Sequence, residues 1–225
     1  MARSINGSWK EKHCLVIESF LDELNKVSGR YVLKGETALM ECYNLSRFSE
    51  DIDLDGTSKN EIFRVVERFC KNHGYTYRIA KDSPTVSRFM IDYGGVNQYG
   101  SKPLKIEVSY RKKIIQKSNI KKINGYTVYN LDTLGIMKYQ AYLARDKIRD
   151  LHDIVFIVNN YYDCLQSSTI VGITNALAEK GLEQFYYIIS TQDDELIDKD
   201  KLETDFLKAF ELLELNGEQI DEYEI

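Results

Sequence analysis

The sequence predicts a mixed α/β domain followed by a helical region. Over residues 1–125, segments in which apolar residues recur at helical spacing alternate with short segments that have the pattern of β-strands. From Leu131 the pattern is helical almost to the end of the chain. We therefore expect an α/β core at residues 1–125 and a helical C-terminal region at residues 126–225.

Three helices are expected in the first part. In a capping box, a serine and the glutamate three residues after it satisfy each other's free backbone amides at the start of a helix. A glycine past the last turn ends the helix. These signals occur at Ser8, Glu11 and Gly29 for one helix and at Ser58, Glu61 and Gly74 for another. A brief helix is expected between them, at Thr37–Leu45.

Strand patterns and a basic segment complete this part. The expected strands are Tyr31–Leu33, Glu50–Leu54, Tyr75–Ile79, Arg88–Tyr93, Leu104–Tyr110 and Gly125–Tyr129. Between Ser101 and Lys122, eight lysines and arginines stand against a single acid, Glu107. We interpret the end of this segment as a basic loop, which suits a triphosphate or RNA. A solvated loop without a ligand is the alternative.

The composition indicates an ordinary folded protein of the cytoplasm. Of the 225 residues, 43% are hydrophobic and 29% are charged. No apolar segment has the length of a signal peptide or a membrane span. The four cysteines form no CxxC pair, as expected of reduced thiols. The net charge of −5 is uneven, because residues 191–225 carry −10 and the remainder +5. We expect no membrane partner.

Asp51 and Asp53 are the sharpest candidates for chemistry. On a strand they share one face, while Ile52 points to the other. Two carboxylates this close repel each other unless a cation lies between them. Mg²⁺ usually binds one or two protein carboxylates, and water and substrate phosphates complete its shell. The pair therefore indicates a Mg²⁺ site, which Mn²⁺ can also fill, and a plain surface strand is the alternative.

Two further residues of the first part fit such a site. Gly35 lies between an expected strand and an expected helix, where backbone amides can approach a phosphate. Glu107 lies between the core-facing Ile106 and Val108 on a later strand. It is a candidate third metal ligand or proton acceptor, and an exposed strand glutamate is an equal alternative.

The helix expected after Leu131 adds positive charge. On one continuous helix, Arg145 and Arg149 each fall within roughly 20° of Lys138 around the helix axis. A separate apolar stripe on that helix consists of Met137, Ala141, Ala144, Ile148, Leu151 and Val155. Asp153 lies within pairing reach of Arg149. The cations are a candidate clamp for a triphosphate, and a salt-bridged surface is the alternative.

Three motifs occur in order between about Tyr31 and Ile154. They are Leu33–Leu39 (LKGETAL), Arg47–Leu54 (RFSEDIDL), and Lys138 followed by Arg145, Arg149, Asp150 and Asp153. Together they resemble the AbiEii/AbiGii toxin family of nucleotidyltransferases. The Arg-x-Ser-x-Asp-Ile-Asp-Leu element is the most specific of the three, and the helical element is the second.

The resemblance implies a polymerase-β-like minimal nucleotidyltransferase fold, with a mixed sheet flanked by helices and a helical C-terminal region. It implies Asp51 and Asp53 as metal ligands, and Lys138 as a contact of the triphosphate. Asp153 would be a second essential polar residue near it, and Ser49 holds the position of a hydroxyl residue beside the first aspartate. Members of the family act as toxins paired with an antitoxin, and some attach nucleotides to the acceptor end of tRNA.

One position departs from the family pattern. The family usually has two small residues after the first strand, and here the second of them is Glu36. A carboxylate beside a phosphate-binding turn repels a triphosphate unless the carboxylate is paired, and Lys34 is the candidate partner.

We therefore expect transfer of a nucleoside monophosphate from a nucleoside triphosphate to an acceptor. The expected acceptor is RNA, such as the tRNA acceptor end, and the expected protein partner is an antitoxin. The candidate nucleotide-binding residues are Gly35, Ser49, Lys138 and Arg145. One alternative is a catalytically weak nucleotide-binding module, motivated by Glu36. Another is an enzyme that modifies a small molecule such as an antibiotic.

Overall fold

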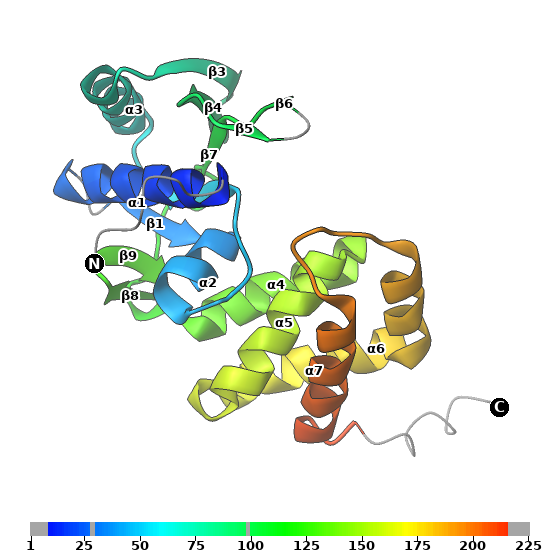
Figure 1. Cartoon of the computed structure of the whole chain (residues 1–225). Helices are drawn as coiled ribbons and strands as arrows, with labels where there is room; N and C mark the ends of the chain where they lie inside the picture. Colours follow the sequence, from blue (N-terminus) through cyan, green and yellow to red (C-terminus); the bar gives the residue numbers. More distant parts are fainter. Residues whose placement is uncertain (1–8, 28–29, 98–99, 216–225) are drawn as a thin grey trace. The chain divides into compact units, whose positions relative to one another are not determined.

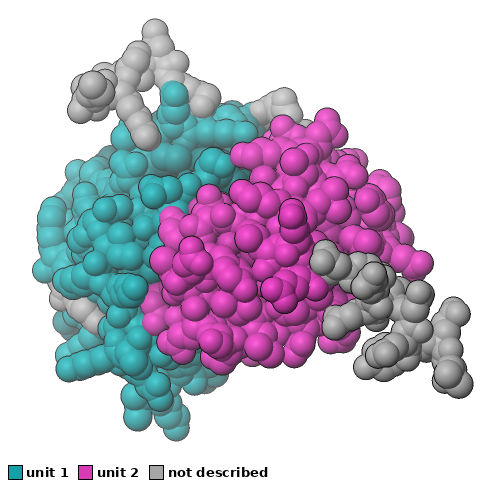
Figure 2. All heavy atoms as spheres, turned by 90° about the horizontal axis from the view of Figure 1, so that it is seen from below, with its two compact units in different colours: residues 1–129 teal, residues 130–225 magenta. Residues whose placement is uncertain are grey.

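The computed structural model describes residues 9–27, 30–97 and 100–215 and divides the chain into two compact units. Unit 1 is Met1–Tyr129 and unit 2 is Asn130–Ile225, coloured teal and magenta in Figure 2. Unit 1 contains a mixed sheet with helices and unit 2 is helical, so the predicted fold class is confirmed. Within the described residues, no helix is both long and apolar enough to cross a membrane.

Unit 1 contains a seven-stranded mixed sheet in the order β3-β4-β7-β2-β1-β9-β8 (Figure 1). Its strands are β1 (Tyr31–Lys34), β2 (Asp51–Gly56), β3 (Thr76–Asp82), β4 (Val86–Asp92), β7 (Leu104–Ser109), β8 (Ile120–Ile123) and β9 (Tyr126–Tyr129). Strand β1 runs parallel to β9 and β2 runs parallel to β7, whereas the other neighbours are antiparallel. The short strands β5 (Val96–Asn97) and β6 (Gly100–Ser101) pair with each other. The helices are α1 (Trp9–Val27), α2 (Gly35–Tyr43) and α3 (Lys59–His73).

One face of this sheet is apolar and packs against α3. Phe89 on β4 and Ile106 on β7 are neighbours across the sheet, and both are fully buried. The ring of Phe89 packs edge-on against Phe63 of α3, with centroids 4.8 Å apart. Phe69 of α3 in turn packs against Phe20 of α1, with centroids 5.2 Å apart. The side chains that alternate with these core residues therefore emerge on the opposite face of the sheet.

The expected signals at the helix ends are met only in part. Ser58 occupies the N-cap of α3, but its side chain makes no capping hydrogen bond. Glu61 instead lies 3.9 Å from Arg30, so the predicted capping box is wrong. Gly74 ends α3 in the left-handed conformation, as predicted. The signals Ser8 and Gly29 lie outside the described residues.

The basic segment is not a continuous loop, which corrects the expectation for it. Strand β8 forms inside the segment and pairs antiparallel with β9. The two strands are joined at Asn124 and Gly125, which both have positive φ angles, of 52° and 85°. An Asn-Gly pair is the preferred sequence for a two-residue hairpin turn, so the signal for this hairpin was present in the sequence.

Unit 2 contains the helices α4 (Leu131–Arg145), α5 (Ile148–Tyr161), α6 (Ser167–Thr191) and α7 (Lys199–Leu212). Helix α4 begins at a side-chain cap, because Asn130 accepts a hydrogen bond of 2.9 Å from the backbone amide of Thr133. Residues of α4 to α7 share one hydrophobic core. Within it, the rings of Phe185 and Phe206 stack with centroids 3.8 Å apart. The core holds these helices together as one packed unit.

The continuous helix expected after Leu131 is wrong, because the chain breaks at Asp146. Asp146 has a left-handed conformation with φ 46° and ends α4, and α5 begins at Ile148. Arg149 therefore lies on a different helix from Lys138 and Arg145. The predicted apolar stripe is also wrong over α4, where the buried residues are Leu131, Leu134, Gly135, Lys138 and Tyr142.

Candidate active site

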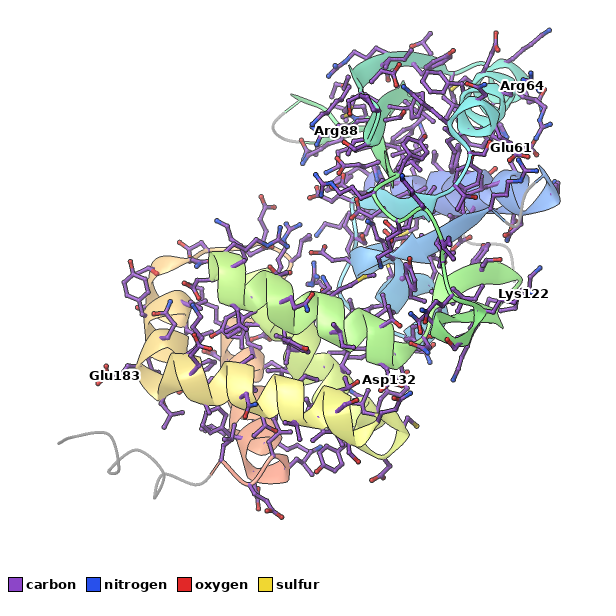
Figure 3. The ribbon with its side chains drawn as sticks, turned by 180° about the vertical axis from the view of Figure 1, so that it is seen from behind. Glu61, Arg64, Arg88, Lys122, Asp132 and Glu183 are labelled. Atoms are coloured by element: carbon purple, nitrogen blue, oxygen red, sulfur yellow. The ribbon has the colours of Figure 1, made fainter. Side chains whose placement is uncertain are left out.

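The face of the unit 1 sheet opposite its apolar face is charged, and we call it the polar face. Its charged residues are Lys34, Asp51, Asp53, Asp55, Arg88, Lys105 and Glu107. Strand pairing orders four of these residues in one row across β1, β2, β7 and β4, namely Lys34, Asp53, Glu107 and Arg88. The row thus has a cation at each end and two carboxylates in the middle. Arg88, labelled in Figure 3, comes from β4.

Asp51 and Asp53 share the polar face as predicted, and Ile52 between them is fully buried. Burial and the charge of Asp51 raise the pKa of Asp53 to about 6. The Nζ atom of Lys105 contacts Oδ2 of Asp51, its neighbour across β2 and β7. Burial lowers the pKa of Lys105, but its hydrogen bond to Asp51 and the nearby carboxylates outweigh burial and leave that pKa above its usual value. The two aspartates therefore form a site of concentrated negative charge.

Gly35 brings the turn between β1 and α2 against this pair. It is the first residue of α2 and has a positive φ of 72°. A Cβ atom at this position would lie 2.9 Å from Oδ2 of Asp53, so only glycine fits without a shift. The predicted phosphate-binding turn and one predicted metal ligand are therefore in direct proximity.

Glu107 lies beside Asp53 but is held by an arginine. Its Oε2 atom accepts a hydrogen bond of 2.7 Å from Nε of Arg88 and lies 2.6 Å from Nη2 of Arg88 in an ion pair. Among the described residues, no group of three or more His, Cys, Asp or Glu side chains is arranged to hold a metal ion. The three-carboxylate metal site predicted with Glu107 is therefore not present in this conformation, because Arg88 already neutralises the third carboxylate.

Asp55 is a further residue of the polar face that the sequence reasoning missed. It is 2% exposed and accepts hydrogen bonds of 2.5 Å from Lys34 and 2.7 Å from the hydroxyl of Tyr129. Burial raises the pKa of Asp55, but the hydrogen bonds and charges of Lys34, Tyr129 and Lys112 outweigh burial and leave that pKa below its usual value. Asp55 is therefore a buried anchor between strands. Its signal was the third aspartate in the alternation along β2.

The carboxylate of Glu36 is paired, although not with the expected partner. Its Oε2 atom accepts a hydrogen bond of 2.8 Å from Nη1 of Arg47. The side chain of Arg47 is 1% exposed and that of Glu36 is 21% exposed. Lys34, the predicted partner, bonds to Asp55 instead. The one departure from the family pattern is thus paired with a buried cation, which comes from the second motif, Arg47–Leu54.

Ser49 is buried next to the site and is not exposed at its surface. The residue is 1% exposed, and its hydroxyl is 2.7 Å from the hydroxyl of Thr37 on α2. Thr37 also donates a hydrogen bond to the backbone carbonyl of Asp51. The predicted nucleotide contact of Ser49 is therefore not supported by its position, since its hydroxyl is enclosed where α2 meets the start of β2.

Unit 2 holds the predicted Lys138 and Asp153 together in its interior. Their side chains are 8% and 0% exposed, and Nζ of Lys138 lies 2.5 Å from Oδ2 of Asp153. Nζ of Lys138 also lies 3.7 Å from Oδ1 of Asp150, which is fully buried. Arg145, whose side chain is 59% exposed, donates two hydrogen bonds to Asp150, of 2.6 and 2.8 Å. Asp150 thus forms ion pairs with two of the predicted cations, Lys138 and Arg145.

Arg149 has a partner that its spacing did not suggest. Its guanidinium bonds to both carboxylate oxygens of Asp194, in the segment between α6 and α7. This contact fixes the start of α5 within unit 2. Arg149 is therefore part of the internal structure of unit 2 in this conformation.

The donor set at Asp51 and Asp53 fits a hard divalent cation. Both residues present carboxylate oxygens from the same face of β2, and the side chain of Asp51 is 37% exposed. The approach of Gly35 to Asp53 leaves room where a side chain would block the carboxylate. Two carboxylates with water and substrate phosphates make up a common Mg²⁺ shell.

Two structures from Helicobacter pylori are similar over nearly the whole chain, each with 24% identity and a TM-score of 0.74. The crystal structure of JHP933 matches over 95% of this chain and 95% of its own. A structure described as a "putative nucleotidyltransferase" matches over 93% of this chain and 96% of its own. At this identity the two structures show the fold.

The family is shown by the sequence itself. The model of the nucleotidyl transferase AbiEii toxin, of type IV toxin–antitoxin systems, matches residues 19–223. The chain belongs to this family of nucleotidyltransferase toxins, which confirms the resemblance seen in its motifs. A comparison with curated proteins finds no match.

Proposed function

We propose that the protein transfers a nucleoside monophosphate from a nucleoside triphosphate to an RNA acceptor, such as the acceptor end of tRNA. The observation that carries this proposal is the Asp51–Asp53 pair with the Gly35 turn against it. The family description supports the role of toxin, restrained by a separately encoded antitoxin. Because triphosphates and RNA are its substrates, we place the reaction in the cytoplasm.

In the proposed reaction, the acceptor hydroxyl attacks the α-phosphorus in line with the leaving pyrophosphate. The new O–P bond forms as the bond to pyrophosphate breaks, and the hydroxyl loses its proton. A bound Mg²⁺, or Mn²⁺ in its place, would neutralise phosphate charge and lower the pKa of the acceptor hydroxyl. Asp51 and Asp53 would hold the cation, and the backbone at Gly35 would contact a phosphate. Acceptance of the proton by Glu107 stays a prediction.

Release of pyrophosphate from each of the four triphosphates, with and without total cell RNA, tests this function. We expect release that depends on RNA and on Mg²⁺. A nucleotide-binding module without turnover would bind a triphosphate and release no pyrophosphate. Release without labelling of RNA would favour a small-molecule acceptor, and either result would contradict the proposal.

The basic segment is the proposed approach for RNA, and β8 offers the cleanest test. Lys121 and Lys122 of β8 are exposed, and Lys122 is labelled in Figure 3. Lys112 is less suitable, because its amine lies 3.3 Å from the buried Asp55. We expect Lys121→Glu with Lys122→Glu to weaken RNA labelling. The slope of log affinity against log salt should fall in magnitude by about one for each RNA phosphate that the variant no longer neutralises.

The matched control for this prediction lies in unit 2. Glu211→Lys with Glu214→Lys reverses two exposed charges of the opposite sign, and we expect no loss of RNA labelling. Measured RNA affinity at several salt concentrations distinguishes the two variants. If the lysine variant labels RNA as well as the wild type does, at every salt concentration, β8 does not contact the acceptor.

The predicted contact between Lys138 and the triphosphate is tested by comparing ligands. Lys138→Met should weaken triphosphate binding by about 1.5–3 kcal/mol, as for loss of a charge-assisted contact, and should weaken monophosphate binding much less. Calorimetric binding measurements with both ligands provide the comparison. Because Lys138 is paired with the buried Asp153, thermal unfolding must accompany them. Equal weakening for both ligands would mean that Lys138 serves only the packing of unit 2.

A further inference from the structure

One of the two carboxylates of the proposed metal site is already paired with a lysine amine. Lys105 on β7 is the neighbour of Asp51 on β2, and its Nζ atom contacts Oδ2 of Asp51. The side chains of Lys105 and Asp51 are 31% and 37% exposed. The pair is therefore within reach of ions from solution, and it is not a sealed structural salt bridge.

The surrounding charges explain why the amine lies there. Asp53 is next to Asp51 on the same face of β2, and Glu107 is next to Asp53 on β7. Three carboxylates in so small an area repel one another unless cations lie among them. Arg88 bonds to Glu107, and Lys34 bonds to the buried Asp55. Lys105 is the cation that pairs with Asp51 itself.

We propose that Lys105 is a resident counter-cation of the Asp51–Asp53 pair, which a divalent metal ion must displace from Asp51 before it can bind. The inference rests on the proposed function, because it concerns the same carboxylates. It makes Lys105 a positioning residue that competes with the metal ion in the free protein. The released amine, on a flexible four-carbon stem, then becomes available to an anion such as a substrate phosphate.

Two consequences follow from this competition. The free protein binds a divalent cation more weakly than its two carboxylates alone would, because the ion must replace an existing ion pair. A triphosphate whose phosphate oxygens bind the released amine lowers the free-energy cost of breaking the Lys105–Asp51 ion pair. The metal ion and the nucleotide therefore favour each other's binding. Linkage requires this coupling to be reciprocal.

The test is the affinity of the nucleotide-free, full-length protein for Mn²⁺, followed by the electron paramagnetic resonance signal of the free ion. We expect Lys105→Gln to bind Mn²⁺ about fivefold more tightly than the wild type, which corresponds to removal of a well-placed competing ion pair. Lys105→Met, which keeps most of the stem, should show the same gain. Lys105→Arg keeps the charge and should stay close to the wild type.

Lys102→Gln is the matched control. Lys102 is 35% exposed and pairs at 3.0 Å with Glu50, the residue directly before Asp51. The control removes a similar charge nearby without freeing Asp51, so its Mn²⁺ affinity should stay within about twofold of the wild type. An equal gain in Lys102→Gln and Lys105→Gln would overturn the inference, because the effect would then be one of overall charge.

Asp51→Asn separates failure of the inference from failure of the proposed function. If Mn²⁺ binding is lost in Asp51→Asn but is equal in the wild type and both uncharged Lys105 variants, the metal site stands and the role of Lys105 is refuted. If no protein shows Mn²⁺ binding that depends on Asp51, the proposed metal site itself is wrong, and the inference falls with it.

Discussion

Asp51→Asn and Asp53→Asn are each expected to reduce nucleotidyl transfer by at least about 100-fold, since a metal ion contributes several kcal/mol to such a reaction. Each change removes one charge from the pair and almost no volume. The residues share the polar face next to Gly35, so loss of either carboxylate removes half of the protein's donor set. The measurement is initial transfer rate at limiting Mg²⁺.

Thermal unfolding provides the control for these two variants. Burial and Asp51 raise the pKa of Asp53 to about 6, so Asp53 is still mostly ionised at pH 7 but its charge lowers the stability of the folded protein. Removing that charge should therefore not lower the unfolding temperature at pH 7. Glu67→Gln, on the exposed side of α3, removes a remote acid and should leave transfer unchanged. Near-wild-type transfer by either aspartate variant at limiting Mg²⁺ would show that the metal-site assignment is wrong.

Arg47→Met is expected to lower the free energy of unfolding by about 3 kcal/mol, the lower end of the range for breaking a buried ion pair. The guanidinium of Arg47 is almost fully enclosed and bonds to Glu36 at 2.8 Å. Loss of this guanidinium leaves the carboxylate of Glu36, in the first turn of α2, without its ion pair to Arg47. The measurement is urea denaturation of the whole protein. Triphosphate binding should weaken as well, because the exposed negative charge lies beside the proposed phosphate contact.

A double-mutant cycle shows whether Arg47 acts through Glu36. In Glu36→Gln with Arg47→Met both charges are absent, so the double variant should recover part of the stability and triphosphate affinity that Arg47→Met loses. Additive losses would mean that the two side chains do not interact. If Arg47→Met lowers the free energy of unfolding by less than about 0.5 kcal/mol, as an ordinary surface substitution does, the ion pair of Arg47 does not stabilise the fold and the prediction is wrong.

The sequence was most informative where a single strand or turn determines the position of a residue. Alternation along β2 was enough to place Asp51 and Asp53 on one face, and Gly35 after a short strand was enough to mark the turn. The helical break at Asp146 was not visible, because a left-handed aspartate ends α4 where no glycine or proline stands. The periodic pattern continued across this break, so one helix was predicted in place of α4 and α5.

Partners that are distant in the chain could not be predicted in this way. The contact of Lys105 with Asp51 depends on the parallel register of β2 and β7, and the bond from Arg88 to Glu107 depends on the register of β4. Such registers are set by packing of the whole sheet and not by local pattern. The partner of Glu36 was misassigned for the same reason, since Lys34 is only two residues away in the sequence but pairs with Asp55 in the sheet.

The central claim is that a nucleoside monophosphate is transferred, and comparison of two positions of label tests it most directly. The wild-type protein is incubated with Mg²⁺, total cell RNA and each triphosphate, labelled either at the α-phosphorus or at the γ-phosphorus. We predict that the α label enters RNA and that the γ label is released in pyrophosphate. With Asp51→Asn, we predict neither incorporation of the α label nor release of labelled pyrophosphate. Transfer of γ label to RNA, or no incorporation of α label from any triphosphate, would contradict the claim.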